Sequence, residues 1–297
     1  MLAAAAAFGG AQSRSLLAEL GADSHVVARE VDAERWALHG RRTVAMHTGP
    51  LSDLARRWRA VWEVGCGATL DGVSSLEAGG LRGFDSDVID VSVSRAARPT
   101  AASGVRIHRV ERVPGETLRT GPPRSRPEIA GVRGARWATS DRQAALLLVL
   151  PAQQRLLRPA ALVAAEEQVP GRSRRALVHQ LVRDIANGAQ SLGELDFARA
   201  CRRRGLPPPD RQVVVETNRG RVYLDVRWSS IGLVVEIDGA GHQWGLAPAG
   251  DTLRQNTVTL AGDMVLRIDL VGWRLRPNDY LDQVCAAHAL LTARRAA

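Results

Sequence analysis

Residues 221–238 read RVYLDVRWSSIGLVVEID, two runs of strand-forming residues separated by a short Ser-Ser turn. β-Branched and aromatic residues at this density, with so tight a gap, predict two neighbouring antiparallel strands. The run RQVVVET (211–217) precedes them across the turn NRG, so we expect a three-stranded meander. Two carboxylates, Glu236 and Asp238, interrupt the last strand where its apolar pattern otherwise indicates core, and they need an explanation.

Strand geometry places these carboxylates close together. Glu236 and Asp238 are two residues apart and share one face of their strand, and Asp225 lies on the preceding strand of the same hairpin. Three half-buried carboxylates repel one another unless a cation is present. Magnesium binds one or two protein carboxylates together with water and phosphate oxygens, and it activates water for attack on a phosphodiester. We therefore expect a Mg²⁺ or Mn²⁺ site here.

A second interpretation of the same acids stays open. Asp225 and Glu236 would face solvent and form ion pairs, as most exposed acids near arginines do. The candidate partners are Arg227, Arg254 and Arg267. The apolar run around Glu236 and the glycine-rich loop after it favour the metal-site interpretation.

The segments on either side complete a mixed helix and strand pattern. SLGELDFARACRRRGLPPP (191–209) begins with a Ser-x-x-Glu capping box, predicts an amphipathic helix and ends in glycine and prolines. After the meander we expect a helix near 252–260, a strand over DMVLRIDL (263–270) and a closing helix from 277 to about 294. The predicted order is helix, three strands, helix, strand, helix.

This order resembles the PD-(D/E)XK nuclease superfamily, with Glu194 on a helix, Asp225 on the second strand and Glu236-Ile237-Asp238 on the third. EIDGAGH (236–242) and DTLRQNTVTLAGDMVLRID (251–269) are similar to the branch of very-short-patch-repair endonucleases. That branch carries Glu-x-Asp-Gly, a nearby His, Asp-x-x-Arg on a helix and Gly-x-x-Val-Leu-Arg on the last core strand. The similarity covers roughly residues 189–290.

The resemblance implies a restriction-endonuclease-like αβββαβ core and a magnesium-dependent or manganese-dependent DNA endonuclease. It implies that Asp225 and Glu236 are metal ligands, together with the carbonyl of Ile237. Glu194 would orient metal-bound water, and His242 would transfer a proton or contact the scissile phosphate. The catalytic set implied is thus Glu194, Asp225, Glu236, Asp238 and His242.

The resemblance also gives roles to Arg254, which would hold a carboxylate or DNA phosphate, and to Asp251, which would fix the loop and helix. Simpler explanations remain open, because Glu194 also fits a helix capping box, His242 a loop stacking contact and Arg254 a surface ion pair. The chain departs from the superfamily at one position. Asp238 stands where the superfamily usually has lysine, and the short-patch-repair branch also lacks that lysine.

The N-terminal segment predicts a different kind of domain. AQSRSLLAEL (11–20) and DSHVVAREVD (23–32) each place apolar residues on one helical face, the second with Asp23 or Ser24 as N-cap. Two short helices joined by a glycine-containing turn fit a helix-turn-helix. RWALHGRRTVAM (35–46) adds two strands around a turn, which predicts a wing. A generic helical hairpin with a trailing strand explains the same pattern.

In the functional interpretation, the second helix enters the DNA major groove with Ser24, His25 and Arg29 outward. Arg41 and Arg42 on the wing would contact phosphates. This segment and the one after it also resemble abortive-infection antitoxins and transcriptional regulators that precede such nuclease domains.

The middle of the chain reads as mixed structure. DVIDVSVS (87–94) and GVRIHRV (104–110) alternate apolar and polar residues as half-buried strands do, with a Pro/Ala/Ser turn between them. A loop rich in Pro, Gly and Arg follows over 112–126. We then expect three helices, the first capped by Ser140 and stopped by Pro151. These helices are SDRQAALLLVL (140–150), RPAALVAAEEQ (158–168) and SRRALVHQLVRDIA (173–186).

Composition bounds the environment and the partners. The formal net charge is +9, and all 40 basic residues are arginine. This favours a phosphate-carrying partner such as DNA, although a GC-rich genome that enriches arginine codons explains it equally well. The three cysteines have no paired spacing, which suits a reducing cytoplasm. No signal sequence or membrane-spanning window is evident, so we expect a cytoplasmic protein.

The sequence therefore predicts an α/β protein of three domains. These are a winged helix-turn-helix over 1–72, a mixed α/β linker or recognition domain over 73–188 and a nuclease domain over 189–297. The first function hypothesis is a Mg²⁺-dependent or Mn²⁺-dependent DNA endonuclease with no membrane partner and no small-molecule cofactor. The second is a non-catalytic DNA-binding regulator or antitoxin with a degenerate nuclease fold, its toxin or other protein partner unknown. A protein-interaction module without nucleic acid is the third.

Overall fold

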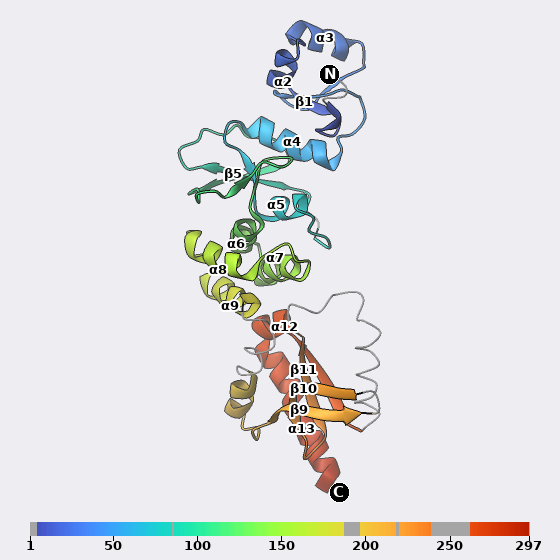
Figure 1. Cartoon of the computed structure of the whole chain (residues 1–297), viewed down its shortest axis with the longest axis vertical. Coiled ribbons are helices and arrows are strands. Elements are labelled where there is room, and N and C mark those ends of the chain that lie inside the picture. The colour runs from blue at the N-terminus through green and yellow to red at the C-terminus, as the bar shows by residue number, and fades with distance from the viewer. Residues whose placement is uncertain (1–4, 85, 187–196, 218–219, 239–261, 297) are drawn as a thin grey trace. The chain divides into compact units, whose positions relative to one another are not determined.

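The computed structural model describes residues 5–84, 86–186, 197–217, 220–238 and 262–296 (Figure 1). Only the backbone is described in some of them, namely 211–217, 220–225, 237–238, 269–270 and 296. The chain forms two compact units. Unit 1 is Met1–Trp137 with Ala164–Ser173, and unit 2 is Ala138–Val163 with Arg174–Ala297. Helices and sheets are mixed throughout, which confirms the predicted α/β class. The three-domain division remains a prediction.

The N-terminal part of unit 1 is a pair of helices beside a small antiparallel sheet of order β1-β3-β2. Asp23 is the N-cap of the second helix, because its side chain accepts the backbone N–H groups of His25 and Val26. Leu17, Val27, Trp36 and Val44 are among the residues of its core. The elements are β1 (Ala11–Ser13), α2 (Arg14–Glu19), α3 (Ser24–Asp32), β2 (Ala37–Leu38) and β3 (Thr43–Ala45).

The rest of unit 1 is built around a five-stranded sheet of order β6-β5-β4-β8-β7. The predicted strands over 87–94 and 104–110 are present, but they pair in parallel, so residues 95–104 form a crossover and not a hairpin turn. The arginine-rich loop contains two strands of two residues each, β7 and β8. The elements are α4 (Asp53–Val64), β4 (Thr69–Leu70), α5 (Gly72–Ala78), β5 (Ile89–Ser94), β6 (Val105–Val110), β7 (Thr117–Leu118), β8 (Arg124–Ser125) and α6 (Pro127–Trp137).

The three helices predicted after residue 140 are present. They are α7 (Asp141–Gln153), α8 (Pro159–Gln168) and α9 (Arg175–Ala186). Ser140 caps α7 as expected, accepting the backbone N–H of Gln143. The prediction that Pro151 ends this helix is wrong, because the helix continues to Gln153. Proline removes one backbone hydrogen bond, but Leu147, Leu148 and Pro151 are all buried, and this packing keeps the last turn helical.

The C-terminal part of unit 2 is a four-stranded sheet of order β12-β11-β10-β9. Strands β9, β10 and β11 form the predicted meander, and β12 pairs in parallel with β11. The helix expected near 252–260 lies outside the described residues, and the helix before the meander is described over 197–203. The elements are β9 (Asp210–Thr217), β10 (Gly220–Trp228), β11 (Leu233–Asp238), β12 (Met264–Asp269), α12 (Leu270–Leu275) and α13 (Pro277–Ala296).

One long helix covers a face of this sheet. Figure 1 shows α13, in red, lying across the strands, and Leu281 and Val284 join Val226 and Val235 in one buried cluster. Arg274 on α12 holds α9 through a buried ion pair to Asp184, with two N–H groups 2.8 and 2.9 Å from the carboxylate oxygens. Within the described residues, no helix is long and apolar enough to cross a membrane.

Candidate functional site

The sheet of unit 2 determines where the predicted metal ligands lie. In the antiparallel pair of β10 and β11, Val226 lies opposite Val235. Continuing this register by one residue places Asp225 opposite Glu236. Both positions are in the two central strands of the sheet, as a shared site requires.

Glu236 is buried, with 5% of its surface exposed. Its carboxylate has a protein partner, because Arg267 on β12 lies opposite it in parallel register with Nε 3.2 Å from Oε2. Burial agrees with the metal-site interpretation, and the arginine partner agrees with the ion-pair interpretation. A buried carboxylate needs such a positive partner, whether a side chain or a metal.

The other predicted catalytic residues are described only in part. Ile237 and Asp238 are the last two residues of β11, where Asp238 pairs in register with Asp269, but their side chains are not described. Glu194, His242, Asp251 and Arg254 lie outside the described residues. In the part of the chain that the structure describes, no three His, Cys, Asp or Glu side chains gather as a metal-binding group.

The predicted DNA-reading residues share one helix. Ser24, His25 and Arg29 all lie on α3 and are exposed, as a helix that enters a groove requires. The side chain of Arg29 is 69% exposed and forms an ion pair with Glu30 at 3.4 Å. At the start of the helix, the backbone N–H of Val26 lowers the pKa of the Asp23 carboxyl, which keeps the N-cap charged.

The predicted wing tip is held by helix α4. The buried carboxylate of Glu63 accepts the backbone N–H groups of Arg41 and Arg42, at 2.9 and 2.8 Å, and the hydroxyl of Thr43, at 2.7 Å. Arg42 also donates through Nη1 to the carbonyl of Trp62 at 3.1 Å. Both arginine side chains remain exposed on this fixed loop. The role of Glu63 is not evident from sequence, because nothing local marks a glutamate in a helix as a hydrogen-bond acceptor for a distant loop.

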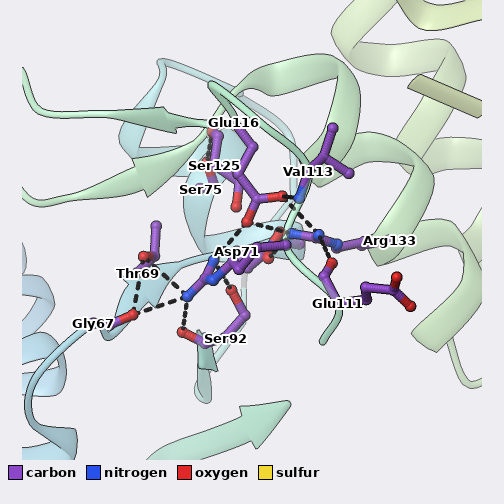
Figure 2. Close-up of polar contacts among 12 residues, drawn as sticks. Gly67, Thr69, Asp71, Ser75, Ser92, Glu111, Val113, Glu116, Ser125 and Arg133 are labelled. Carbon is purple, nitrogen blue, oxygen red and sulfur yellow. Dashed lines mark hydrogen bonds and ion pairs between the residues drawn. The ribbon is translucent and has the colours of Figure 1, made fainter. Parts of the chain in front are cut away.

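A buried charge network lies within unit 1 (Figure 2). Arg133 on α6 contacts the carboxylates of Asp71 and Glu116, each at 2.8 Å, and Arg112 reaches Glu116 at 2.7 Å. Arg133, Asp71 and Glu116 are almost fully buried. Two arginines and two acids balance in charge, which such burial requires.

The network has consequences for titration. Burial would raise the pKa of Glu116, but hydrogen bonds from Arg133 and Arg112 outweigh it, so this pKa lies below the ordinary value. Burial would likewise lower the pKa of Arg133, yet Asp71 and Glu116 raise it. Glu116 and Arg133 are therefore both charged at neutral pH, and their ion pair ties α6 to the segment just before β7.

Comparison with known proteins assigns this chain to no family. No protein-family model matches this chain, and no curated protein matches it either. The nuclease and antitoxin resemblances therefore rest on the residues themselves.

Proposed function

We propose that this chain is a DNA-binding protein whose C-terminal sheet carries a metal-dependent endonuclease site. The register that sets Asp225 opposite the buried Glu236 supports this most strongly. Burying an acid on a central strand, next to Leu, Val and Ile, costs free energy unless a positive group or a metal ion compensates its charge. A meander followed by a parallel strand is also the strand arrangement that an αβββαβ core requires.

The donor set suits a hard divalent cation. Asp225, Glu236 and the carbonyl of Ile237 would hold Mg²⁺ or Mn²⁺, since oxygen ligands are what these ions prefer. The bound ion would polarise the phosphodiester and lower the pKa of the attacking water. Glu194 would orient that water, and His242 would move a proton or contact the scissile phosphate. Asp238 lies at the end of β11, beside the same site.

The N-terminal elements would supply DNA binding. Two helices, β1 and the β2–β3 hairpin in sheet order β1-β3-β2 fit a winged helix-turn-helix. α3 would read the major groove through Ser24, His25 and Arg29, with Arg41, Arg42 and Arg254 contacting phosphates.

Plasmid cleavage tests the catalytic part. Purified protein is incubated with supercoiled plasmid and Mg²⁺ or Mn²⁺, beside Asp225→Asn and Glu236→Gln. The matched control is Asp282→Asn, which changes an exposed acid on α13. We expect the wild type and the control to cleave and both site variants to be inactive. Absence of cleavage with either metal, or cleavage by Asp225→Asn at the wild-type rate, would refute an endonuclease.

A second function has an observation of its own. The ion pair from Arg267 already neutralises Glu236, as expected if the fold is retained for binding only. In that case the chain is a DNA-binding regulator or antitoxin. Its DNA affinity would survive loss of Asp225 and Glu236, and no metal would produce cleavage. Fluorescence anisotropy on the variants used for the cleavage assay separates the two functions.

A further inference from the structure

A hollow of about 160 Å³ lies in unit 1, between β6, the end of α6 and residues 169–173. This volume is many times the roughly 10–15 Å³ that holds one water molecule. Arginine dominates its lining. The charged lining residues are Arg95, Arg109, Glu111, Arg133, Arg136 and Arg172.

The two buried arginines are fixed by protein partners. Arg133 belongs to the charge network with Asp71 and Glu116, and Figure 2 shows its guanidinium beside Glu111, whose carbonyl it reaches at 2.9 Å. Arg136 donates to the carbonyl of Val169 and lies 3.6 Å from the carboxylate of Glu166. These contacts give the hollow a rigid and polar wall.

The three exposed arginines are less compensated. Arg109 donates to the carbonyls of Arg95 and Ala97, at 3.1 and 2.7 Å. These bonds orient its guanidinium, but neutral carbonyls do not compensate its positive charge. Among the described residues, no ion pair joins Arg95, Arg109 or Arg172 to a carboxylate. Glu111 is the one acidic residue of the lining. Like charges gathered around one hollow repel each other and favour an anion between them.

Gly171 shapes the remaining side of the hollow. Its φ is +145°, and a Cβ atom there would lie 3.3 Å from Cδ of Arg136. Glycine therefore allows the backbone of 169–173 to lie directly on the Arg136 side chain. This places Arg172 on the lining, across from the arginines of the β6 side.

We propose that this hollow binds phosphate, either as the free ion or as the terminal phosphate group of a monoester. Guanidinium groups present paired N–H donors that match phosphate oxygens, and several together hold a doubly charged group. The phosphate comes either from a small phosphorylated molecule or from the 5′ end of a nucleic-acid strand. The proposed phosphate site shares no residue with the carboxylates of unit 2 and does not depend on cleavage there.

Isothermal titration calorimetry in phosphate-free, low-salt buffer tests the site. The probes are inorganic phosphate and one short single-stranded oligonucleotide with either a 5′-phosphate or a 5′-hydroxyl. The test variant is Arg95→Gln/Arg172→Gln, which changes two exposed side chains that form no ion pair with any other described residue. The control is Arg98→Gln, which removes an exposed charge outside the lining. Circular dichroism confirms that each variant is folded.

We expect the double variant to bind inorganic phosphate at least about tenfold more weakly, since each lost charge-assisted hydrogen bond costs about that factor. The control should bind as the wild type does. Preference for the 5′-phosphorylated strand over its 5′-hydroxyl form assigns the source to nucleic-acid ends, and equal binding of the two assigns it to small molecules. If neither inorganic phosphate nor the 5′-phosphorylated strand binds, the proposal is overturned. Equal weakening by Arg98→Gln does so as well.

Discussion

Arg267 on β12 lies opposite Glu236 on β11 in parallel register, and its Nε approaches Oε2 to 3.2 Å. The pair occupies the position where the nuclease hypothesis needs a metal ligand. A divalent cation that binds Glu236 must therefore share this carboxylate with Arg267 or displace it. The two functions proposed for the sheet differ in which cation the carboxylate prefers.

Replacing Arg267 by glutamine tests that competition. We expect Arg267→Gln to lower the free energy of unfolding by about 1–2 kcal/mol without metal, because Glu236 loses its partner while the exposed side of the pair is solvent-screened. Added Mg²⁺ should raise the melting temperature of this variant more than that of the wild type. Differential scanning fluorimetry with and without MgCl₂ measures both effects.

The control for this experiment is Glu236→Gln/Arg267→Gln, which has neither charge. It should regain stability and show no response to Mg²⁺. If Mg²⁺ shifts the melting temperature of all three proteins equally, Glu236 is not a metal ligand.

The charge network of unit 1 gives a prediction about stability. Arg133→Met removes the cation between Asp71 and Glu116 and leaves two buried carboxylates with too little positive charge. We expect a loss of about 3–5 kcal/mol in the free energy of unfolding, measured by urea denaturation. Arg126→Met, an exposed arginine just before α6, should change it by less than about 0.5 kcal/mol. A similar small change in both variants would show that the network contributes little.

The same network predicts an acid limit of stability. The pKa of Glu116 in the folded chain lies below its ordinary value of 4.5, so the unfolded chain takes up the proton first as pH falls. This stabilisation is therefore complete above about pH 4.5 and is lost as pH falls through the lower folded pKa. Unfolding free energies measured from neutral pH to pH 3 should show the decline. Glu116→Gln should be less stable at pH 7 and should show a shallower decline, and an unchanged slope would contradict the assignment.

Much of unit 2 could be predicted from sequence, because its strands are β-branched runs with tight gaps. Unit 1 was harder. Helix α6 carries two interior glycines, which weaken a helical pattern, so Arg133 gave no sign of being buried. The parallel pairing of β5 and β6 depends on a crossover that local sequence does not encode. Pro151 predicts the end of a helix because helix propensity takes no account of the burial that holds α7 together.

Only part of the candidate site could be predicted from sequence. The strand pattern alone placed Asp225 and Glu236 in neighbouring strands. Choosing Arg267 from three candidate arginines required the register of β12, which is set by a connection of more than twenty residues. Glu63 and the wing loop are likewise distant in sequence, and only the folded chain brings them together.

Glu63 leads to a prediction about that loop. Glu63→Ala leaves two backbone N–H groups and the Thr43 hydroxyl without their acceptor, which should cost about 1–3 kcal/mol of unfolding free energy. Faster hydrogen exchange at the amides of Arg41 and Arg42, measured by NMR, should accompany it. Glu63→Gln keeps one acceptor oxygen and should show a smaller change. Unaltered exchange in Glu63→Ala would mean that the loop holds its shape without α4.

The DNA-binding proposal predicts a difference between two exposed arginines near α3. Arg29 lies on the helix that would enter the groove, whereas Arg35 follows the helix and is bound to Glu30 at 2.6 Å. Arg29→Ala should weaken binding to duplex DNA about tenfold, since it removes a groove or phosphate contact, and Arg35→Ala should have little effect. Fluorescence anisotropy with a labelled duplex, repeated over a series of salt concentrations, measures the affinity and its salt dependence. If Arg29 contacts a phosphate, its loss also reduces the slope of log affinity against log salt by about one. Equal affinities of the two variants would show that the charge of α3 acts only through the overall basic balance of the chain, and α3 would then not be the recognition helix.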